Sequence, residues 1–265
     1  MSLLFATVFA AYVASVFQLL EITKIAAWHF GINNGIPYKV NMNTRQLQHG
    51  EHLTPFSCAP VVYNFNYESD LAAFTDPEFS NNYCAQNAFI ADGSLVLRLT
   101  AECGPSIGPV LEFREGRVEA RVRTGKTSGV VTSLYLRSGI GTEGDQDEVD
   151  VEFVGKDPTH FQSFFWVGGQ RGQAEPDYHD VGHDTSKDFH IYGIDYRADA
   201  IKWLFDGKVV RVLRRSNTAK FPTKPQRFKA TIWDGNSFDD WAGNGSAVEF
   251  PQYAYFDWIR FWPYC

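Results

Sequence analysis

Apolar and polar residues alternate along most of this chain in short stretches bounded by glycine, asparagine or aspartate. Because successive side chains of a strand point to opposite faces, alternation with a period of two predicts β-strands. Asp92-Gly93 and Asp206-Gly207 are signals for tight hairpin turns. The predicted strands and hairpins cover residues 61–65, 89–99, 117–123, 129–136, 161–166, 189–196, 200–211 and 255–261. Short strands separated by turn signals, without a long helical period, predict an all-β sandwich.

Residues 147–154 alternate acidic and apolar side chains. As a strand, this stretch places Glu148, Asp150 and Glu152 on one face and the intervening valines and phenylalanine on the other. The apolar face is expected in the core, and residues 161–166 are expected to run antiparallel beside this strand. The other face then carries a row of three carboxylates.

Like charges on neighbouring positions repel one another, and the repulsion raises the pKa of at least one carboxyl group. Three interpretations fit the row: a charged edge strand that blocks aggregation, a calcium site, or a glycosidase pair of nucleophile and general acid. The Cα atoms of Glu148 and Glu152 are about 13 Å apart along a strand. A retaining glycosidase needs its two carboxyl groups about 5–5.5 Å apart. The spacing therefore fits only if the strand crosses the floor of a cleft and the side chains lean together.

The stretch from Glu148 to Gly155 resembles the E-x-D-x-E signature of glycoside hydrolase family 16. Its spacing is similar to that of the branch with lichenases, plant xyloglucan transglycosylases and fungal cell-wall transglycosylases. Further segments resemble the family in the same order; they are residues 113–120, 189–196, 201–208, 232–233 and 241–243. The resemblance extends over residues 61–265. It implies a concanavalin-like β-jelly-roll sandwich with a concave glycan-binding cleft.

The resemblance also implies the roles of the acids. Glu148 is expected to be the nucleophile, and Glu152 the general acid that later acts as base. Asp150 is expected to hydrogen-bond the nucleophile and keep the two glutamate pKa values apart. Water as acceptor gives hydrolysis and a glycan end gives transglycosylation, which this chemistry does not separate. No cofactor is required, although a structural calcium ion stays open. A catalytically inactive, extracellular glycan-binding module is the alternative function.

Glycan clefts stack sugar rings on aromatic side chains and bind the hydroxyls with polar groups. The aromatic candidates here are Trp166, Trp233 and Trp241, and the resemblance to the family adds Gln162 as a cleft residue. Each tryptophan has the alternative of lying in the core, and either Trp166 or its neighbour Phe165 must face the cleft. The resemblance places Trp241 near the sugar that accepts the glycosyl group, which favours a transferase slightly. The glycan stays open among β-1,3-glucan, mixed-linkage glucan, xyloglucan and chitin.

Composition and charge limit the kinds of molecule that we expect this protein to bind. Apolar residues make up 44% of the 265 residues, enough for one large core. A net charge of −7 without a lysine or arginine run argues against nucleic-acid binding, and a neutral polysaccharide needs no counter-charge. His179, His183, Asp180 and Asp184 imitate a metal cluster, but we expect them to be solvated loop residues, so no metal site is predicted.

Residues 1–20 are apolar and uncharged, which predicts a signal peptide or, without cleavage, a membrane anchor. Residues 21–57 lack a clear period and are interpreted as a linker or extension, which leaves residues 58–265 as the catalytic sandwich. The protein is therefore expected to be secreted or in the cell wall; a membrane-anchored protein is the alternative.

The chain has four cysteines. An even number in an exported chain predicts two disulfides, for which we favour the pairs Cys58–Cys265 and Cys84–Cys103. Four free thiols are the alternative.

Overall fold

The computed structural model describes residues 29–33, 36–40, 60–65, 76, 79–139, 144–238, 240–243 and 248–264. The chain forms two compact units, residues 1–53 and 54–265. In the first unit, β1 (His29–Asn33) and β2 (Ile36–Val40) pair antiparallel, a hairpin that the sequence pattern did not predict. The predicted signal or anchor, residues 1–20, lies outside the described residues. Across the part of the chain that is described, no helix has the length and apolar character needed to span a membrane.

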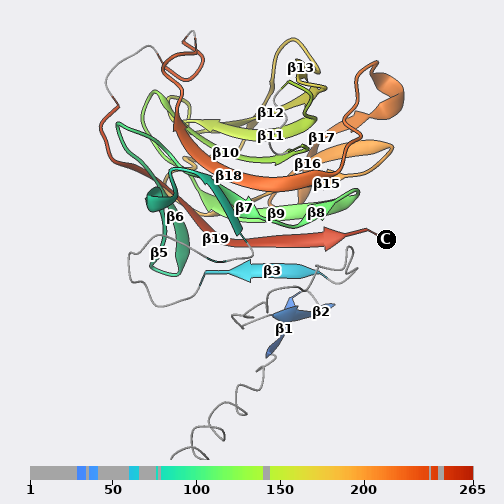
Figure 1. Cartoon of the computed structure of the whole chain (residues 1–265), viewed down its shortest axis with the longest axis horizontal. Helices are drawn as coiled ribbons and strands as arrows, with labels where there is room; N and C mark the ends of the chain where they lie inside the picture. The colour runs from blue at the N-terminus through green and yellow to red at the C-terminus, as the bar shows by residue number, and fades with distance from the viewer. Residues whose placement is uncertain are drawn as a thin grey trace, which may run out of the picture. The chain divides into compact units, whose positions relative to one another are not determined.

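The second unit contains two antiparallel sheets, whose strands overlap in the view of Figure 1. In the first sheet the main order is β13 (Gln170–Arg171), β12 (His160–Val167), β11 (Glu148–Val154), β10 (Val130–Arg137), β18 (Gln226–Asp234), β7 (Ser106–Pro109) and β4 (Phe79–Tyr83). Two further strands of this sheet pair off that path: β14 (Asp177–Asp180) with β12, and β8 (Glu112–Phe113) with β18.

The second sheet has the main order β17 (Lys208–Arg214), β16 (Ala200–Phe205), β15 (His190–Tyr196), β9 (Gly116–Arg123), β19 (Gln252–Pro263), β6 (Ser94–Leu99) and β5 (Ala88–Ala91). In addition, β3 (Val61–Asn64) pairs with β19. Single 3₁₀ turns follow β4 and β17, at Ala85–Asn87 and Arg215–Asn217. The predicted all-β jelly-roll sandwich is thus confirmed.

Both predicted hairpin turns are present. Asp92 and Gly93 join β5 to β6, and Asp206 and Gly207 join β16 to β17; all four residues have positive φ angles. Glycine adopts this backbone without steric cost, and aspartate tolerates it better than most residues, which is why these dipeptides occupy the turns.

The core fills the space between the sheets, because each strand directs its apolar face inward. Val149, Val151 and Phe153 of β11 are almost fully buried there, as predicted, and Phe153 packs edge-on against Tyr192 of β15. The predicted disulfide Cys84–Cys103 is confirmed. Its predicted counterpart, Cys58–Cys265, involves cysteines outside the described residues.

One strand that was not among the predicted strands is central to the site. β18 lies between β10 and β7, and its Phe228, Ala230 and Ile232 are buried in the core. Arg227, Lys229, Thr231 and Trp233 occupy the alternate positions, on the face that meets the cleft.

Candidate active site

The acidic strand β11 lies in the interior of its sheet, between β10 and β12. Opposite residues of antiparallel strands share a face, so the register defines the surroundings of each acid. Each acid has one neighbour on β10 and one on β12: Arg137 and Trp166 for Glu148, Tyr135 and Phe164 for Asp150, Ser133 and Gln162 for Glu152. The three carboxylates therefore lie in a row along an interior strand rather than on an exposed edge.

This row forms one wall of a cleft with a volume of about 260 Å³. The cleft is lined by Ser106, Ser133, Tyr135, Arg137, Glu148, Asp150, Glu152, Thr231 and Trp233. It crosses β7, β18, β10 and β11, so four neighbouring strands supply its polar groups. The geometric condition set by the sequence, that the acidic strand must cross a cleft, is met.

Glu152 is the acid most suited to hold a proton. Burial, followed by the negative charge of Glu148, raises the pKa of Glu152 to about 7, although a hydrogen bond from Ser133 Oγ at 3.4 Å opposes the rise. At neutral pH a large share of Glu152 is therefore protonated, which is the state a general acid needs.

Burial raises the pKa of both Glu148 and Asp150. At Glu148, the charge of Arg137 and the hydrogen bond shared with Asp150 oppose the rise. At Asp150, the charges of Glu148 and Glu152 and the same hydrogen bond raise the pKa further, to well above its ordinary value. Asp150 therefore favours its protonated form and donates the hydrogen bond to the Glu148 carboxylate.

An aromatic cluster lies at the Glu152 end of the row. Trp241 donates its indole N–H to Gln162 Oε1 at 2.8 Å, and it stacks on Trp233 with ring centroids 5.8 Å apart. Phe238, which is 54% exposed, packs edge-on against both tryptophans. The structure thus brings Gln162, Trp233 and Trp241 together, and it adds Phe238, which the sequence analysis missed because this residue lies in a loop without periodicity.

At the other end of the row, Trp166 faces the carboxylates and hydrogen-bonds Asp150, whereas its neighbour Phe165 is buried in the core. Trp166, and not Phe165, is therefore the residue on the face of the carboxylates. Phe164 shares the face of Trp166, and the Arg171 guanidinium lies 5.0 Å from its ring centroid.

The sequence analysis also missed five lining residues, which are Ser106, Ser133, Tyr135, Arg137 and Thr231. Tyr135 hydroxyl and Ser106 Oγ are hydrogen-bonded at 3.2 Å, and burial raises the pKa of Tyr135 to about 12, so this residue stays a neutral phenol. The strand pattern alone marks these residues as polar positions on a half-buried face. Only the register shows that they surround the acids.

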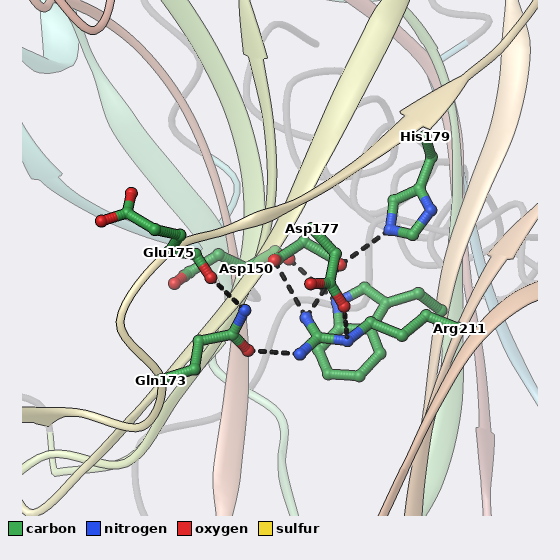
Figure 2. Close-up of polar contacts among 8 residues, drawn as sticks. Asp150, Gln173, Glu175, Asp177, His179 and Arg211 are labelled. Atoms are coloured by element: carbon green, nitrogen blue, oxygen red, sulfur yellow. Dashed lines mark hydrogen bonds and ion pairs between the residues drawn. The ribbon is translucent and has the colours of Figure 1, made fainter.

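A polar network lies behind β11 (Figure 2). Trp203 of β16 donates its indole N–H to the backbone carbonyl of Asp150 at 2.9 Å, so the opposite sheet holds β11 at its middle acid. The Arg211 guanidinium covers the Trp203 ring at 4.4 Å, donates to Ser163, and pairs with Asp177 at 2.7 Å.

His179 belongs to this network rather than to a metal site. Its Nε2 lies 2.8 Å from Ser163 Oγ, and burial, together with Arg211, lowers its pKa. Asp180 and Asp184 accept hydrogen bonds from the backbone of Gly182 and Ser186. Within the described ranges, no group of three histidine, cysteine, aspartate or glutamate residues is arranged to hold a metal ion.

Asp147, one residue before β11, anchors the loops next to the cleft. Its buried carboxylate accepts backbone N–H groups of Gly168 at 3.0 Å, Thr223 at 2.7 Å and Lys224 at 3.0 Å. Its own N–H donates to Ser138 Oγ at 2.8 Å. One side chain therefore joins the entry of β11 to the β12–β13 turn and to the loop before β18.

A jelly-roll sandwich with three carboxylates on one strand beside an aromatic-lined cleft is typical of a glycan-active enzyme. The profile of Glycosyl hydrolases family 16 matches residues 75–260, and the chain belongs to this family. It is accordingly an enzyme of the glycoside hydrolase and transglycosylase type.

Known relatives support this assignment. A beta-glucanase of Bacillus amyloliquefaciens is 32% identical over 176 residues, 64% of this chain and 70% of the relative. A Crh-like protein of Candida albicans is 36% identical over 164 residues, 58% of this chain and 35% of the relative. Among solved structures, the beta-glucanase of Bacillus licheniformis has a TM-score of 0.64 at 23% identity, covering 76% of this chain and 97% of its own. The Crh5 transglycosylase has a TM-score of 0.66 at 24% identity, covering 78% and 85%. Both structural likenesses concern the fold.

Proposed function

We propose that this protein remodels β-glucan by a retaining mechanism, with Glu148 as nucleophile and Glu152 as general acid and base. The observation that carries the proposal is the row on β11, where the pKa of Glu152 is raised to about 7 and Glu148 accepts a hydrogen bond from Asp150. This arrangement favours a protonated Glu152 beside an ionised Glu148, the states that a general acid and a nucleophile need.

In the first step Glu148 forms a bond to the anomeric carbon, and the bond from that carbon to the leaving oxygen breaks. The leaving oxygen keeps the electron pair and takes the proton of Glu152. In the second step water or a sugar hydroxyl attacks the anomeric carbon, gives its proton to Glu152 and releases Glu148. Asp150 stabilises the nucleophile through its hydrogen bond. No cofactor enters either step.

The acceptor decides between hydrolysis and transglycosylation, and we favour transfer to a glycan end. Trp233, Trp241 and Phe238 form an aromatic platform on the Glu152 side, where an incoming sugar would stack. The relatives include beta-glucanases and a Crh-like protein, which supports β-glucan as donor; chitin as acceptor is the finer hypothesis. The disulfide Cys84–Cys103 supports a location outside the cytoplasm, in the cell wall or secreted.

The test compares wild type with Glu148→Gln on laminarin, lichenan, xyloglucan and chitin oligomers, with a fluorescent oligosaccharide acceptor present. Longer labelled products that the variant does not form establish a transglycosylase, and shorter products alone establish a hydrolase. Glu249→Gln is the matched control, because Glu249 is exposed and outside the cleft, and it should react like wild type. Binding without turnover in wild type would contradict the proposal and support a glycan-binding module.

A further inference from the structure

Four charged residues form a row across four strands at the Glu148 end of the cleft. The registers place Glu148 of β11 opposite Arg137 of β10, Arg137 opposite Arg227 of β18, and Arg227 opposite Glu112 of β8. The order of charges is therefore acid, arginine, arginine, acid. This order is unusual because two like charges are direct cross-strand neighbours, an arrangement that is destabilising by itself.

Each of the two arginines pairs with the acid beside it. Arg137 Nε lies 3.6 Å from Glu148 Oε2, and Arg227 Nε lies 3.3 Å from Glu112 Oε2. Repulsion between the guanidinium groups favours this arrangement, because each cation gains an opposite charge and moves away from a like one. The positive charge of Arg227 therefore favours the contact between Arg137 and Glu148.

The pair of Arg137 and Glu148 is partly shielded from water, with 32% and 19% of the two side chains exposed. Charge pairs in such surroundings are screened less than surface pairs. Arg137 also lines the cleft itself, next to the carboxylate that the proposed function makes the nucleophile.

We propose that Arg137 is a positioning residue, which holds the Glu148 carboxylate ionised and oriented for attack on the donor sugar. The inference rests on the proposed function. It assigns Arg137 a role separate from that of Asp150, which approaches Glu148 along the same strand, whereas Arg137 approaches it from β10.

The charged and titratable groups around Glu148 are few. Asp150 and Glu152 lie on its own strand, Arg137 and Tyr135 on β10, and the uncharged Trp166 on β12. Arg227 and Lys229 lie one strand further away on β18. Among these groups Arg137 is the cation that lowers the pKa of Glu148. Loss of Arg137 must therefore raise the pH at which the nucleophile ionises.

The experiment measures kcat/KM against pH for wild type, Arg137→Gln, Arg137→Lys and Arg227→Gln, with folding checked by circular dichroism. The acid limb of the profile reports ionisation of the nucleophile in the free enzyme. For R137Q we expect this limb to move to higher pH by about one unit. R137K keeps the charge and should keep the limb, with a lower kcat because a single ammonium replaces the planar guanidinium. R227Q, one strand away, should move the limb by less than half as much.

An unmoved limb in R137Q, or an equal shift in R227Q, would overturn the proposal. If R137Q does not fold, R137K decides, and an unchanged kcat in that variant counts against a positioning role. Absence of turnover in wild type would instead contradict the proposed function. In that case a carboxyl ¹³C titration by NMR still tests the pair, and an equal Glu148 pKa in wild type and R137K but a higher one in R137M would support it, whereas equal values in all three would overturn it.

Discussion

Glu152 lies half-buried between Ser133 and Gln162, and its protonation at neutral pH depends on that burial. The general acid must be protonated, so activity is expected to fall as the pH rises through about 7, the pKa of Glu152. The descending limb of kcat/KM against pH measures this value as an apparent property of the coupled acids. Substitution of Glu152 by Gln should remove this limb and lower kcat by about 10²–10⁴-fold on substrates with poor leaving groups. A descending limb that persists in E152Q would assign the titration to another group.

The same shift predicts a change in stability. The pKa of Glu152 is raised from 4.5 to about 7 in the folded state, so between these values the folded chain binds more protons than the unfolded chain. Stability from this group is therefore present at low pH and is lost as the pH rises to 7. E152Q should match wild type near pH 4 and exceed its free energy of unfolding at pH 8 by on the order of 3 kcal/mol. Urea unfolding at both pH values measures the difference, and Glu249→Gln should show none.

Trp241 combines a hydrogen bond to Gln162 with stacking on Trp233. Trp241→Phe keeps the stacking and loses the hydrogen bond, whereas Trp241→Ala loses both. We expect KM for the glycan acceptor to rise about 3–10-fold in W241A and less in W241F, with donor cleavage little changed. Initial rates at varied acceptor concentration measure this. Tyr253→Ala, in the other sheet, is the control, and an equal effect there would remove Trp241 from the acceptor site.

At the scale of elements, the entry of β11 is fixed by Asp147, whose carboxylate accepts three backbone N–H groups from two loops. Asp147→Ala removes the buried carboxylate that accepts these three hydrogen bonds, so the N–H donors lose their partner. We expect the free energy of unfolding to fall by about 3 kcal/mol, and kcat to fall because the catalytic strand loses its anchor. Chemical denaturation and kinetics measure both.

The control for this variant is close in sequence. Asp145→Ala removes an acid that pairs with Lys224 at 2.7 Å but is 79% exposed. Exposed pairs contribute less than about 1 kcal/mol, so D145A should unfold nearly like wild type. Equal losses in D145A and D147A would show that the loops do not depend on the buried carboxylate.

Across the whole molecule, the sequence pattern predicted the sandwich, the central strands and the acidic row, since period-two alternation and Asp-Gly turns are local signals. The same alternation marks β18, where Phe228, Ala230 and Ile232 are buried between polar positions, although this strand was not among those predicted. The sequence pattern also missed Arg137. The contact of this residue with Glu148 depends on the register between β10 and β11, which is a long-range property. The role of Trp203 at the Asp150 carbonyl could not be predicted either, because the contact crosses between sheets. Pairings between distant segments, rather than strand positions, were therefore what the sequence left open.

The division of the molecule into two units leads to a final prediction. The acids of β11, the cleft and the buried apolar cluster all belong to residues 54–265, the second unit. This unit has its own core, so a chain that starts at Thr54 is expected to fold alone, with a melting temperature within a few degrees of the full chain. Its kcat/KM on short soluble oligosaccharides should equal that of the full chain, because no described lining residue of the cleft precedes Ser106. Calorimetry and kinetics on both chains, produced with disulfide formation, test this. A loss of cooperative unfolding would show that residues 1–53 are part of the folded core, and lost turnover in a well-folded unit would show that they contribute to the site.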